Sequence, residues 1–388
     1  MSKNLLRVPY TTPFPPPIII PRSANTSRAA IQPLIEFLTA PPSRHLKLDE
    51  ARNDKTVLLT GAGISVASGL ADYRGKNGTY TLNKTYRPIY FNEFCSNHEA
   101  RKRYWARSFL GWTNLHKARP NAAHHAVGRL GELGKVSSVI TQNVDSFHPT
   151  AHPHLPTLEL HGYLRSLVCL TCRNEYSRAD FQRQLSTLNP AWAAFLQEVL
   201  ASGALDTENP DERRRKGLRT NPDGDVDIPG APYSTFRYPA CPTCLANEMS
   251  GRIQTDKDGG WLPSSTAGIL KPAVIMFGES IPGPIKEAAE EAVDTSSRIL
   301  VIGSSLATYS AWRLVKKAKE NGMPIGILNI GGVRGEETFF ADVPPGNTGR
   351  EGVRVSESAD QILPEVVKIL ERQRPAMNAK RAQASASI

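Results

Sequence analysis

Residues 56–65 read TVLLTGAGIS, an uncharged run that leads straight into a turn with two glycines. The mostly aliphatic residues 56–60 predict a strand that is buried on both faces of a sheet. Gly61 and Gly63 allow the backbone to approach a pyrophosphate, whose charge the N–H groups of a following helix can meet. A tight strand-to-helix turn without a ligand is the alternative, because this glycine spacing alone is weak evidence.

Two departures from the dehydrogenase pattern argue against hydride transfer. Val66 occupies the position of the third glycine. The residues that follow, 68–75, read SGLADYRG, which is a polar loop and not a second strand that ends in a ribose-binding acid.

The remainder of the chain alternates strand-like and helix-like segments. Strand-like runs without polar alternation belong to parallel sheets that are covered on both faces. Strands of this kind that alternate with helices predict a doubly wound α/β fold, Rossmann-like, with a parallel sheet. The strand-like runs are 56–60, 136–141, 273–277, 299–302 and 325–330, and the helix-like segments include 120–133, 284–293 and 311–320.

Four of the five cysteines form two pairs, Cys169 with Cys172 and Cys241 with Cys244. Thiolates at this spacing form the halves of a tetrahedral zinc site, and four of them leave no position for water. We therefore expect one structural zinc ion in a small module inserted at 167–261, with 46–166 and 262–372 forming the main domain. The long separation of the pairs is unusual for a zinc ribbon, and a redox centre is the alternative.

Polar residues follow the apolar run at 136–141. Gln142, Asn143 and Asp145 come where a parallel strand ends, which is the edge at which open α/β sheets bind ligands. Capping of a turn by the Asn and Asp side chains is the alternative. Further along, His161 is a candidate general base because an imidazole titrates near neutral pH, and a structural histidine is the alternative.

Two later strand ends place small and amide groups at the same edge. Gly303, Ser304 and Ser305 follow one strand, and Asn329 and Gly331 follow the next. Both sets suit a nucleotide, and Asn329 offers an amide to ribose hydroxyls in place of the missing acid.

Residues 271–279 read KPAVIMFGE and contain the strand-like run at 273–277. We expect the end of this strand to expose its backbone beside Phe277 and Gly278. An exposed strand can add a peptide as a further strand of its sheet, so this segment is a candidate substrate-binding edge.

The net charge of +10 lies mostly at the two ends of the chain. Seven of these ten charges fall before residue 36 or after residue 372. Nucleic-acid binding needs positive charge on a folded surface, so direct binding of nucleic acid is disfavoured. No apolar run is long enough to span a bilayer, and five cysteines without a secretory leader indicate a reducing compartment.

We expect residues 1–45 and 373–388 to lie outside the fold, as a disordered leader and a disordered tail. The leader is basic, with no acid before Glu36, and it resembles a mitochondrial transit peptide. Its prolines suit an amphipathic helix poorly, so a plain leader is the alternative. The expected location is the mitochondrial matrix, with the cytoplasm or nucleus as alternatives. The charged stretch at 209–220 is expected to be a solvated loop.

Taken in order along the chain, these motifs resemble the sirtuin family. They are GAGIS, DYR at 72–74, TQNVD, HG at 161–162, the two cysteine pairs, KPAVIMFGE, GSSL at 303–306 and NIG at 329–331. The resemblance spans roughly residues 50–370. The DYR and GSSL motifs, with NPAW at 189–192 and PDGDV at 222–226, resemble the class II branch, that of mitochondrial sirtuin four.

The resemblance implies an NAD-dependent protein lysine deacylase. Such an enzyme cleaves the glycosidic bond of NAD and releases nicotinamide and O-acyl-ADP-ribose, and its partners are proteins that carry acyl-lysine. A protein ADP-ribosyltransferase or a lipoamidase of the same fold is one alternative. A non-catalytic protein that senses NAD or ADP-ribose is another.

The resemblance also implies a role for each motif residue. His161 is the implied general base, and Gln142, Asn143 and Asp145 complete the catalytic set. Phe277 and Gly278 are implied to bind the substrate, and the four paired cysteines to bind zinc. The residues implied to bind NAD are Gly61, Ala62, Gly63, Ile64, Ser65, Asp72, Tyr73, Arg74, Gln142, Asn143, Asp145, Gly303, Ser304, Ser305, Asn329, Gly331 and Ala359.

Overall fold

A parallel sheet forms the centre of the larger of two domains in the computed structural model of the chain. Strands β1 (Thr56–Thr60) and β9 (Arg298–Ile302) are buried at all five of their positions, as expected for a sheet covered on both faces. In spatial order the six strands are β11 (Gly352–Val355), β10 (Ile325–Leu328), β9 (Arg298–Ile302), β1 (Thr56–Thr60), β2 (Val136–Thr141) and β3 (Thr157–Glu159), and every neighbouring pair is parallel. The structure describes residues 14–43, 46, 53–83, 86–203, 219–221, 225–228, 230–247 and 250–385.

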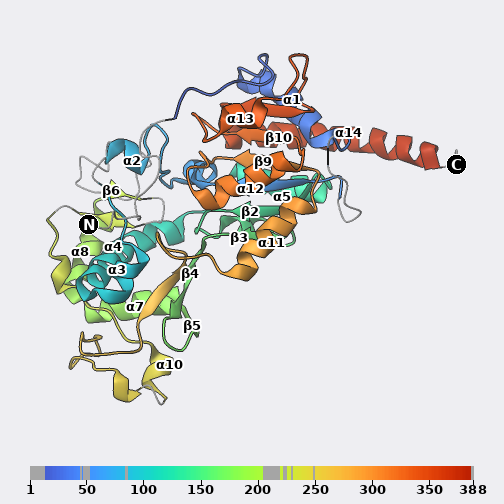
Figure 1. The fold of residues 1–388 in the computed structure, drawn as a ribbon. Helices are drawn as coiled ribbons and strands as arrows, with labels where there is room; N and C mark the ends of the chain where they lie inside the picture. The colour runs from blue at the N-terminus through green and yellow to red at the C-terminus, as the bar shows by residue number, and fades with distance from the viewer. Residues whose placement is uncertain are drawn as a thin grey trace, which may run out of the picture.

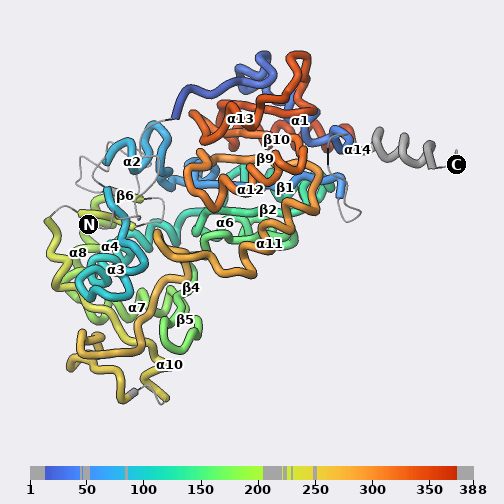
Figure 2. Tube along the Cα trace, viewed as in Figure 1, coloured from blue at the N-terminus to red at the C-terminus, as the bar shows by residue number. Residues whose placement is uncertain are grey.

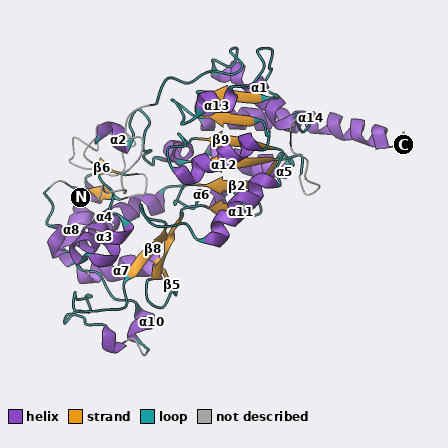
Figure 3. Cartoon of the chain, in the orientation of Figure 1, coloured by secondary structure: helices purple, strands orange, loops and turns teal. Residues whose placement is uncertain are grey.

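Helices cover both faces of this sheet (Figures 1 and 3). On one face, α1 (Ser27–Thr39), α5 (Ala122–Glu132) and α14 (Ala359–Ser385) share a core with Leu58 of β1. On the other face, α11 (Gly283–Asp294), α12 (Tyr309–Glu320) and α13 (Glu336–Phe340) share a core with the neighbouring Leu59. Successive residues of one strand thus face opposite cores. The predicted doubly wound α/β fold is confirmed.

A smaller domain surrounds an antiparallel sheet in the order β5 (Glu175–Ser177), β4 (Gly162–Cys169) and β8 (Leu270–Val274). Its core joins this sheet to α4 (His98–Lys117) and α7 (Arg178–Leu188), where the rings of Trp105 and Phe181 lie 4.5 Å apart. The remaining elements are η1 (Ala62–Ser68), α2 (Thr79–Leu82), α3 (Phe91–Ser96), α6 (Phe147–Ala151), α8 (Pro190–Ala201), β6 (Arg219–Thr220), β7 (Val226–Asp227), η2 (Tyr233–Thr235), α10 (Pro242–Leu245) and η3 (Ser250–Arg252).

The two domains share more of the chain than the predicted boundaries allow. Residues 46–166 were assigned wholly to the main domain, yet α3 and α4 contribute to the core of the smaller one. The run at 273–277 was predicted to be a strand of the parallel sheet, and this prediction is wrong. The strand lies at 270–274 and pairs antiparallel with β4. An apolar pattern shows that a segment is buried, but it does not show in which core.

Part of the predicted leader also belongs to the fold. Within residues 1–45, α1 packs against α14 and β11, with Leu34 and Phe37 fully buried. Its first turn is capped by Thr26, whose Oγ1 accepts a hydrogen bond from the Ala29 amide at 3.2 Å. The leader prediction relied on charge and proline content and overlooked this apolar helix face. Residues 1–13 and 44–45 lie outside the described part of the chain.

The C-terminal end departs from the prediction as well. Helix α14 continues to Ser385, through most of the predicted tail at 373–388, because Ala, Gln, Lys and Arg favour helix there. Most of the charged stretch, residues 209–218, lies outside the described residues. Among the helices that are described, none combines the length and the apolar character needed to cross a membrane.

Candidate functional site

A cavity of about 570 Å³ lies at the carboxyl ends of the central strands, where the larger domain meets the smaller one. The ends of β1, β2, β9 and β10 all contribute to its wall. The predicted site residues that line it are Gly61, Ala62, Gly63, Ser65, Asp72, Tyr73, Arg74, Gln142, Asn143, Asp145, His161, Phe277, Gly278, Gly303, Ser304, Ser305, Asn329 and Gly331.

Two residues predicted to bind the cofactor are not on the cavity wall. The side chain of Ile64 is 1% exposed and packs in the core between the sheet and α1, α5 and α14. Ala359, the first residue of α14, is buried in the same core. Neither side chain is therefore placed to contact the contents of the cavity.

Two glycine-containing turns pack against each other at the base of the cavity. A Cβ on Gly61 or on Gly63 would lie 2.8 Å from an atom of Gly303, closer than real Cβ contacts allow. The Gly63 N–H donates to the Gly303 carbonyl at 2.8 Å, and the Ile64 N–H donates to the Gly61 carbonyl at 3.1 Å. The glycines thus permit close packing of the turns, and some N–H groups predicted to meet a pyrophosphate are already paired.

Asn143, Asp145 and Ser65 form one hydrogen-bonded network beyond the end of β2. Nδ2 of Asn143 donates to the Gly61 carbonyl and to Ser65 Oγ, each at 3.1 Å. Ser65 Oγ donates to Asp145 Oδ2 at 2.7 Å. Burial raises the pKa of Asp145, although hydrogen bonds from the Phe147 amide and from Ser65 oppose the shift. The network ties the end of β2 to η1 and fixes these polar groups on the cavity.

His161 lies between β3 and β4, and both nitrogens of its ring have partners. Nδ1 is 3.1 Å from the carbonyl oxygen of Gln142, and because a carbonyl only accepts, Nδ1 carries the proton. Nε2 is then the acceptor, and Ser310 Oγ donates to it at 2.9 Å. Burial lowers the pKa of His161 to about 4, against the hydrogen bond to Gln142, which raises it. The imidazole is therefore neutral at physiological pH, with a basic Nε2.

The side chain of Gln142 connects the end of β2 to the segment after β9. Its Nε2 donates to Ser304 Oγ at 2.8 Å, and its Oε1 accepts from Thr308 Oγ1 at 3.1 Å. The same residue therefore holds His161 through its main chain and the residues after β9 through its side chain.

The loop at 72–74 is ordered by contacts with the residues that follow it. Oδ1 of Asp72 accepts from the Gly75 amide at 2.9 Å, and burial raises the pKa of this carboxyl group. The guanidinium group of Arg74 lies 4.9 Å from the ring centre of Tyr80, within range of a cation–π interaction. The rings of Tyr73 and Tyr80 are stacked at 5.7 Å. These contacts place an acid, a phenol and a guanidinium group on the cavity.

Asn329 and Gly331 belong to a turn after β10 that a buried ion pair supports. Nε of Arg354 donates to Oε1 of Glu336 at 2.8 Å, and both side chains are buried. Arg354 also donates to the carbonyls of Asn329 at 2.9 Å and Gly331 at 2.6 Å. Glu336 accepts from the Val333 amide at 3.0 Å. One ion pair therefore fixes the whole turn.

Phe277 and Gly278 lie on the cavity just beyond β8. The Phe277 carbonyl accepts from the Phe91 amide at 2.9 Å, so the predicted peptide-binding edge is already paired at one point. Behind it, Lys271 and Glu279 form an ion pair at 2.9 Å. Burial lowers the pKa of Lys271, and the nearby Glu279 carboxylate opposes this shift. The pair braces the segment that was predicted to bind the substrate.

Several cavity residues were missed by the sequence analysis. Thr308 and Ser310 bond to Gln142 and His161, and their one signal was their position a few residues beyond the GSSL motif. Arg107 and Asp225 also line the cavity, and they form an ion pair at 2.7 Å. Arg107 lies within a regular helix, where nothing in the local sequence distinguishes it.

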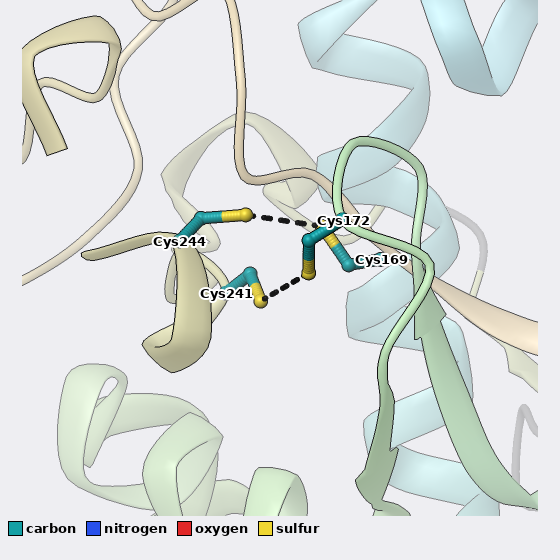
Figure 4. A group of neighbouring side chains, drawn as sticks. All are labelled: Cys169, Cys172, Cys241 and Cys244. Carbon is teal, nitrogen blue, oxygen red and sulfur yellow. Dashed lines mark hydrogen bonds between the residues drawn. The ribbon is translucent and has the colours of Figure 1, made fainter. Parts of the chain in front are cut away.

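The four paired cysteines come together where the end of β4 meets α10, and Figure 4 shows their side chains pointing toward one another. The Sγ atoms of Cys169 and Cys244 are 3.6 Å apart, those of Cys172 and Cys241 are 3.7 Å apart, and all four lie within 4.8 Å of one another. Four sulfur atoms around zinc, at Zn–S distances of about 2.3 Å, are separated by about 3.8 Å. The cluster therefore fits one zinc ion in a closed site, and none of its cysteines is among the residues that line the cavity.

Comparisons with known proteins agree with the motifs. The sequence profile of the Sir2 family matches residues 61–310. The NAD-dependent protein deacylase SIR4 of Batrachochytrium dendrobatidis is 39% identical over 320 residues, which cover 81% of this chain and 90% of that protein. The NAD-dependent protein deacylase Sirt4 of Drosophila melanogaster is 35% identical over 287 residues, which cover 74% of this chain and 77% of that protein. A structure solved for the mechanism and regulation of Sir2 enzymes matches with a TM-score of 0.52 and 25% identity, covering 88% of this chain and 98% of that chain. The resemblance predicted from the motifs is confirmed: the chain belongs to the Sir2 family, the sirtuins.

Proposed function

We propose that this protein is an NAD-dependent protein lysine deacylase. The observation that carries the proposal is the neutral imidazole of His161, with a basic Nε2, on the same cavity as the polar groups beyond β2. A protein that only binds a nucleotide does not need a positioned base in its ligand cavity. The relatives named NAD-dependent protein deacylase support the same activity.

The residues on the cavity fit NAD. The turns at 61–65 and 303–305 present backbone and small side chains, which leave room for a pyrophosphate. We assign 61–65 to the pyrophosphate, 303–305 with Asn329 and Gly331 to the adenosine side, and 142–145 to the ribose and nicotinamide. When bound, NAD supplies a ribose that loses nicotinamide and accepts the acyl group.

His161 is the proposed general base. The Gln142 carbonyl holds the proton on Nδ1, so Nε2 is the one basic atom of the ring. Ser310 Oγ donates a hydrogen bond to Nε2 in this structure. A substrate hydroxyl group has to replace Ser310 at Nε2 before its proton can be transferred. A positioned base of this kind contributes about 100- to 10,000-fold to a rate.

The proposed substrates are proteins that carry acyl-lysine. Main-chain pairing at Phe277 and Gly278, next to the cavity, would hold the peptide beside His161. The motifs at 72–74 and 303–306, together with the Sirt4 relative, favour the class II branch.

We also propose a location in the mitochondrial matrix, on the basis of the basic, acid-free N-terminal sequence. Because α1 belongs to the fold, a removable leader has to end before it. Import of the full chain into isolated mitochondria, with shortening of the chain and protection from added protease, tests the proposal. Exclusion from mitochondria would place the protein in the cytoplasm or nucleus.

The activity is tested by nicotinamide release from NAD. Purified full-length protein is incubated with lysine peptides carrying acetyl, longer acyl, lipoyl or dicarboxylic acyl groups, and with no peptide. We expect release that depends on one acyl class other than lipoyl and is lost in His161→Ala, with zinc content and Tm unchanged. His125→Ala, which removes an exposed histidine of α5, is the matched control and keeps full activity.

Each other outcome identifies a different function. Release that requires the lipoyl peptide would make the protein a lipoamidase. Transfer of label from NAD to protein without an acyl peptide would indicate an ADP-ribosyltransferase. Tight binding of NAD without release, equal in wild type and His161→Ala, would show a sensor and overturn the enzymatic proposal.

A further inference from the structure

Residues 14–20, which we call the N-terminal strap, run along the edge of the parallel sheet and reach the cavity. Ile20 pairs with Arg354 of β11 through two backbone hydrogen bonds of 3.0 and 2.7 Å. At the other end of the strap, Phe14 is half-buried and lines the cavity. Figure 2 shows this N-terminal stretch, in blue, passing along the α13 side of the larger domain. The strap was assigned to the leader from the sequence, yet it contributes to the site.

The ion pair that fixes the turn after β10 also fixes the strap. The Ile18 amide donates to Oε1 of Glu336 at 2.8 Å, and the same oxygen accepts from Nε of Arg354. Arg354 in turn holds the carbonyls of Asn329 and Gly331. The strap and the turn that carries Asn329 are therefore anchored to one buried pair, and their relative position is set by it.

Gly332 marks the point where the strap crosses this turn. A Cβ added to Gly332 would lie 2.0 Å from the Pro15 carbonyl oxygen and 2.7 Å from Cβ of Phe14. No larger residue fits at position 332 while the strap stays in place. Phe14 is thus held directly over the turn at 329–332, which lines the cavity at the end of β10.

The position of Phe14 in the sheet indicates which part of a ligand it meets. The strap is at the β11 and β10 edge, whereas His161 follows β3 at the opposite edge, with β9, β1 and β2 between them. A dinucleotide whose nicotinamide lies near His161 therefore presents its adenosine to Phe14. An aromatic ring beside small backbone groups is suited to stack on the flat face of a purine.

We propose that Phe14 forms a wall of the adenine subsite of the NAD site, and that the anchors of the strap at Ile18 and Ile20 hold it there. This inference rests on the proposed function, because it takes NAD as the ligand. Chain shortening that removed the strap would then weaken NAD binding and leave His161 and its surroundings in place.

The proposal is tested by ligand binding to the full chain. Calorimetry measures the Kd of NAD, ADP-ribose and nicotinamide mononucleotide, which lacks the adenosine, for wild type and Phe14→Ala. We expect the Kd of NAD and of ADP-ribose to rise about five- to hundredfold, as for loss of one aromatic stacking contact. The Kd of nicotinamide mononucleotide stays unchanged, and Phe14→Trp, which keeps an aromatic ring at this position, retains binding of NAD and ADP-ribose.

Three further variants separate this role from a general loss of stability. Pro16→Ala alters an exposed strap residue that does not line the cavity, and it binds all three ligands as wild type does. Gly332→Ala displaces the strap by contact with Pro15, so it weakens NAD binding. The variant with both Phe14→Ala and Gly332→Ala binds no more weakly than the weaker single variant, because both changes remove the same contact.

The possible failures are distinguishable. Wild type that binds neither NAD nor ADP-ribose would overturn the proposed function together with this inference. Wild type that binds and cleaves NAD, with Phe14→Ala unchanged in Kd, would overturn the role of Phe14 alone. Equal weakening of nicotinamide mononucleotide and ADP-ribose in Phe14→Ala would also overturn it, since the effect would not depend on the adenosine.

Discussion

The surroundings of His161 set the pH range in which it can act as a base. Burial lowers its pKa to about 4, from about 6.5 for a free imidazole. The base must be neutral, so activity that depends on it is present above the pKa of His161 and is lost as the pH falls through about 4. We therefore expect kcat/KM for NAD, measured by nicotinamide release, to stay level between pH 7.5 and pH 5.5.

Initial rates at saturating acyl peptide provide this measurement, with circular dichroism at each pH to show that the protein is folded. A kcat/KM that falls by half near pH 6.5 in folded protein would show that the free enzyme holds His161 in a more solvated site than this structure does.

At the scale of single residues, the sequence predicts the site residues that lie close to a recognisable strand or motif. It misses those that reach the site from a distant part of the chain. Gln142, Asn143 and Asp145 were recognisable because they follow a buried strand within a few positions. Ser310 was not, because it reaches His161 across 149 positions of the chain. Ile18 and Glu336 are separated by 318 positions. Contacts of this kind depend on how the strands are ordered in the sheet, which a local pattern does not contain.

At the scale of elements, three histidines are buried beside the end of β1: His124 of α5, His148 of α6, and His152 directly after α6. His148 Nδ1 lies 2.9 Å from His152 Nε2, and His148 Nε2 lies 2.9 Å from Thr60 Oγ1. The ring centre of His124 is 5.0 Å from that of His148. Burial lowers the pKa of all three, and that of His124 falls to about 3. The packing of the two helices therefore requires neutral imidazoles.

This cluster predicts a loss of stability in mild acid. Each imidazole has a lower pKa in the folded state than in the unfolded state, so its unfolded form takes up a proton first as the pH falls below about 6.5. Between pH 7.5 and pH 5.5, His124 alone lowers the free energy of unfolding by about 1.4 kcal/mol. Guanidinium denaturation at the two pH values measures the change.

The variant His124→Gln removes one titrating group of the cluster, and His154→Gln, at an exposed histidine outside the cluster, is its control. We expect His124→Gln to lose about 1.4 kcal/mol of the difference between the two pH values, and His154→Gln to keep the wild-type difference. An unchanged difference in His124→Gln would mean that His124 is already solvated in the folded protein.

The predicted strands were runs that contain no charged residue. The runs at 136–141 and 299–302 agree with β2 and with β9 to within one residue. Strand β11 was not predicted, because the buried Arg354 lies at its centre and pairs with Glu336 instead of water. Helix α1 was not predicted, because the prolines and basic residues around it indicated a disordered leader, although one face of the helix is apolar.

At the scale of the whole molecule, the cavity depends on two domains that are each assembled from distant parts of the chain. The smaller core takes α3 and α4 from before β2 and the cysteine-bearing segments from after β3. Zinc is expected to cross-link the smaller domain, because it would join the end of β4 to α10, which are separated by residues 173–240. Residues of this domain, such as Tyr104 and Val274, line the cavity. The cavity wall therefore depends on the smaller domain being folded.

Removal of zinc is therefore expected to abolish activity without any role for the metal in the chemistry. Four thiolates fill the coordination shell, and zinc held in this way contributes to folding free energy. We expect one zinc ion per chain by mass spectrometry, and we expect Cys172→Ser to lose it. The Tm should fall by roughly 10 °C or more, since a structural zinc site contributes several kcal/mol.

The same change at Cys95, a half-buried cysteine outside the cluster, separates loss of the metal from loss of a thiol. Cys95→Ser should keep zinc, Tm and nicotinamide release. Circular dichroism of Cys172→Ser should retain most of the helical signal, because the helices that cover the parallel sheet pack in cores separate from the cysteine cluster. Zinc-free protein that keeps its Tm but loses activity would instead place the metal in the reaction. Full activity without zinc would show that the apolar core alone keeps the smaller domain folded.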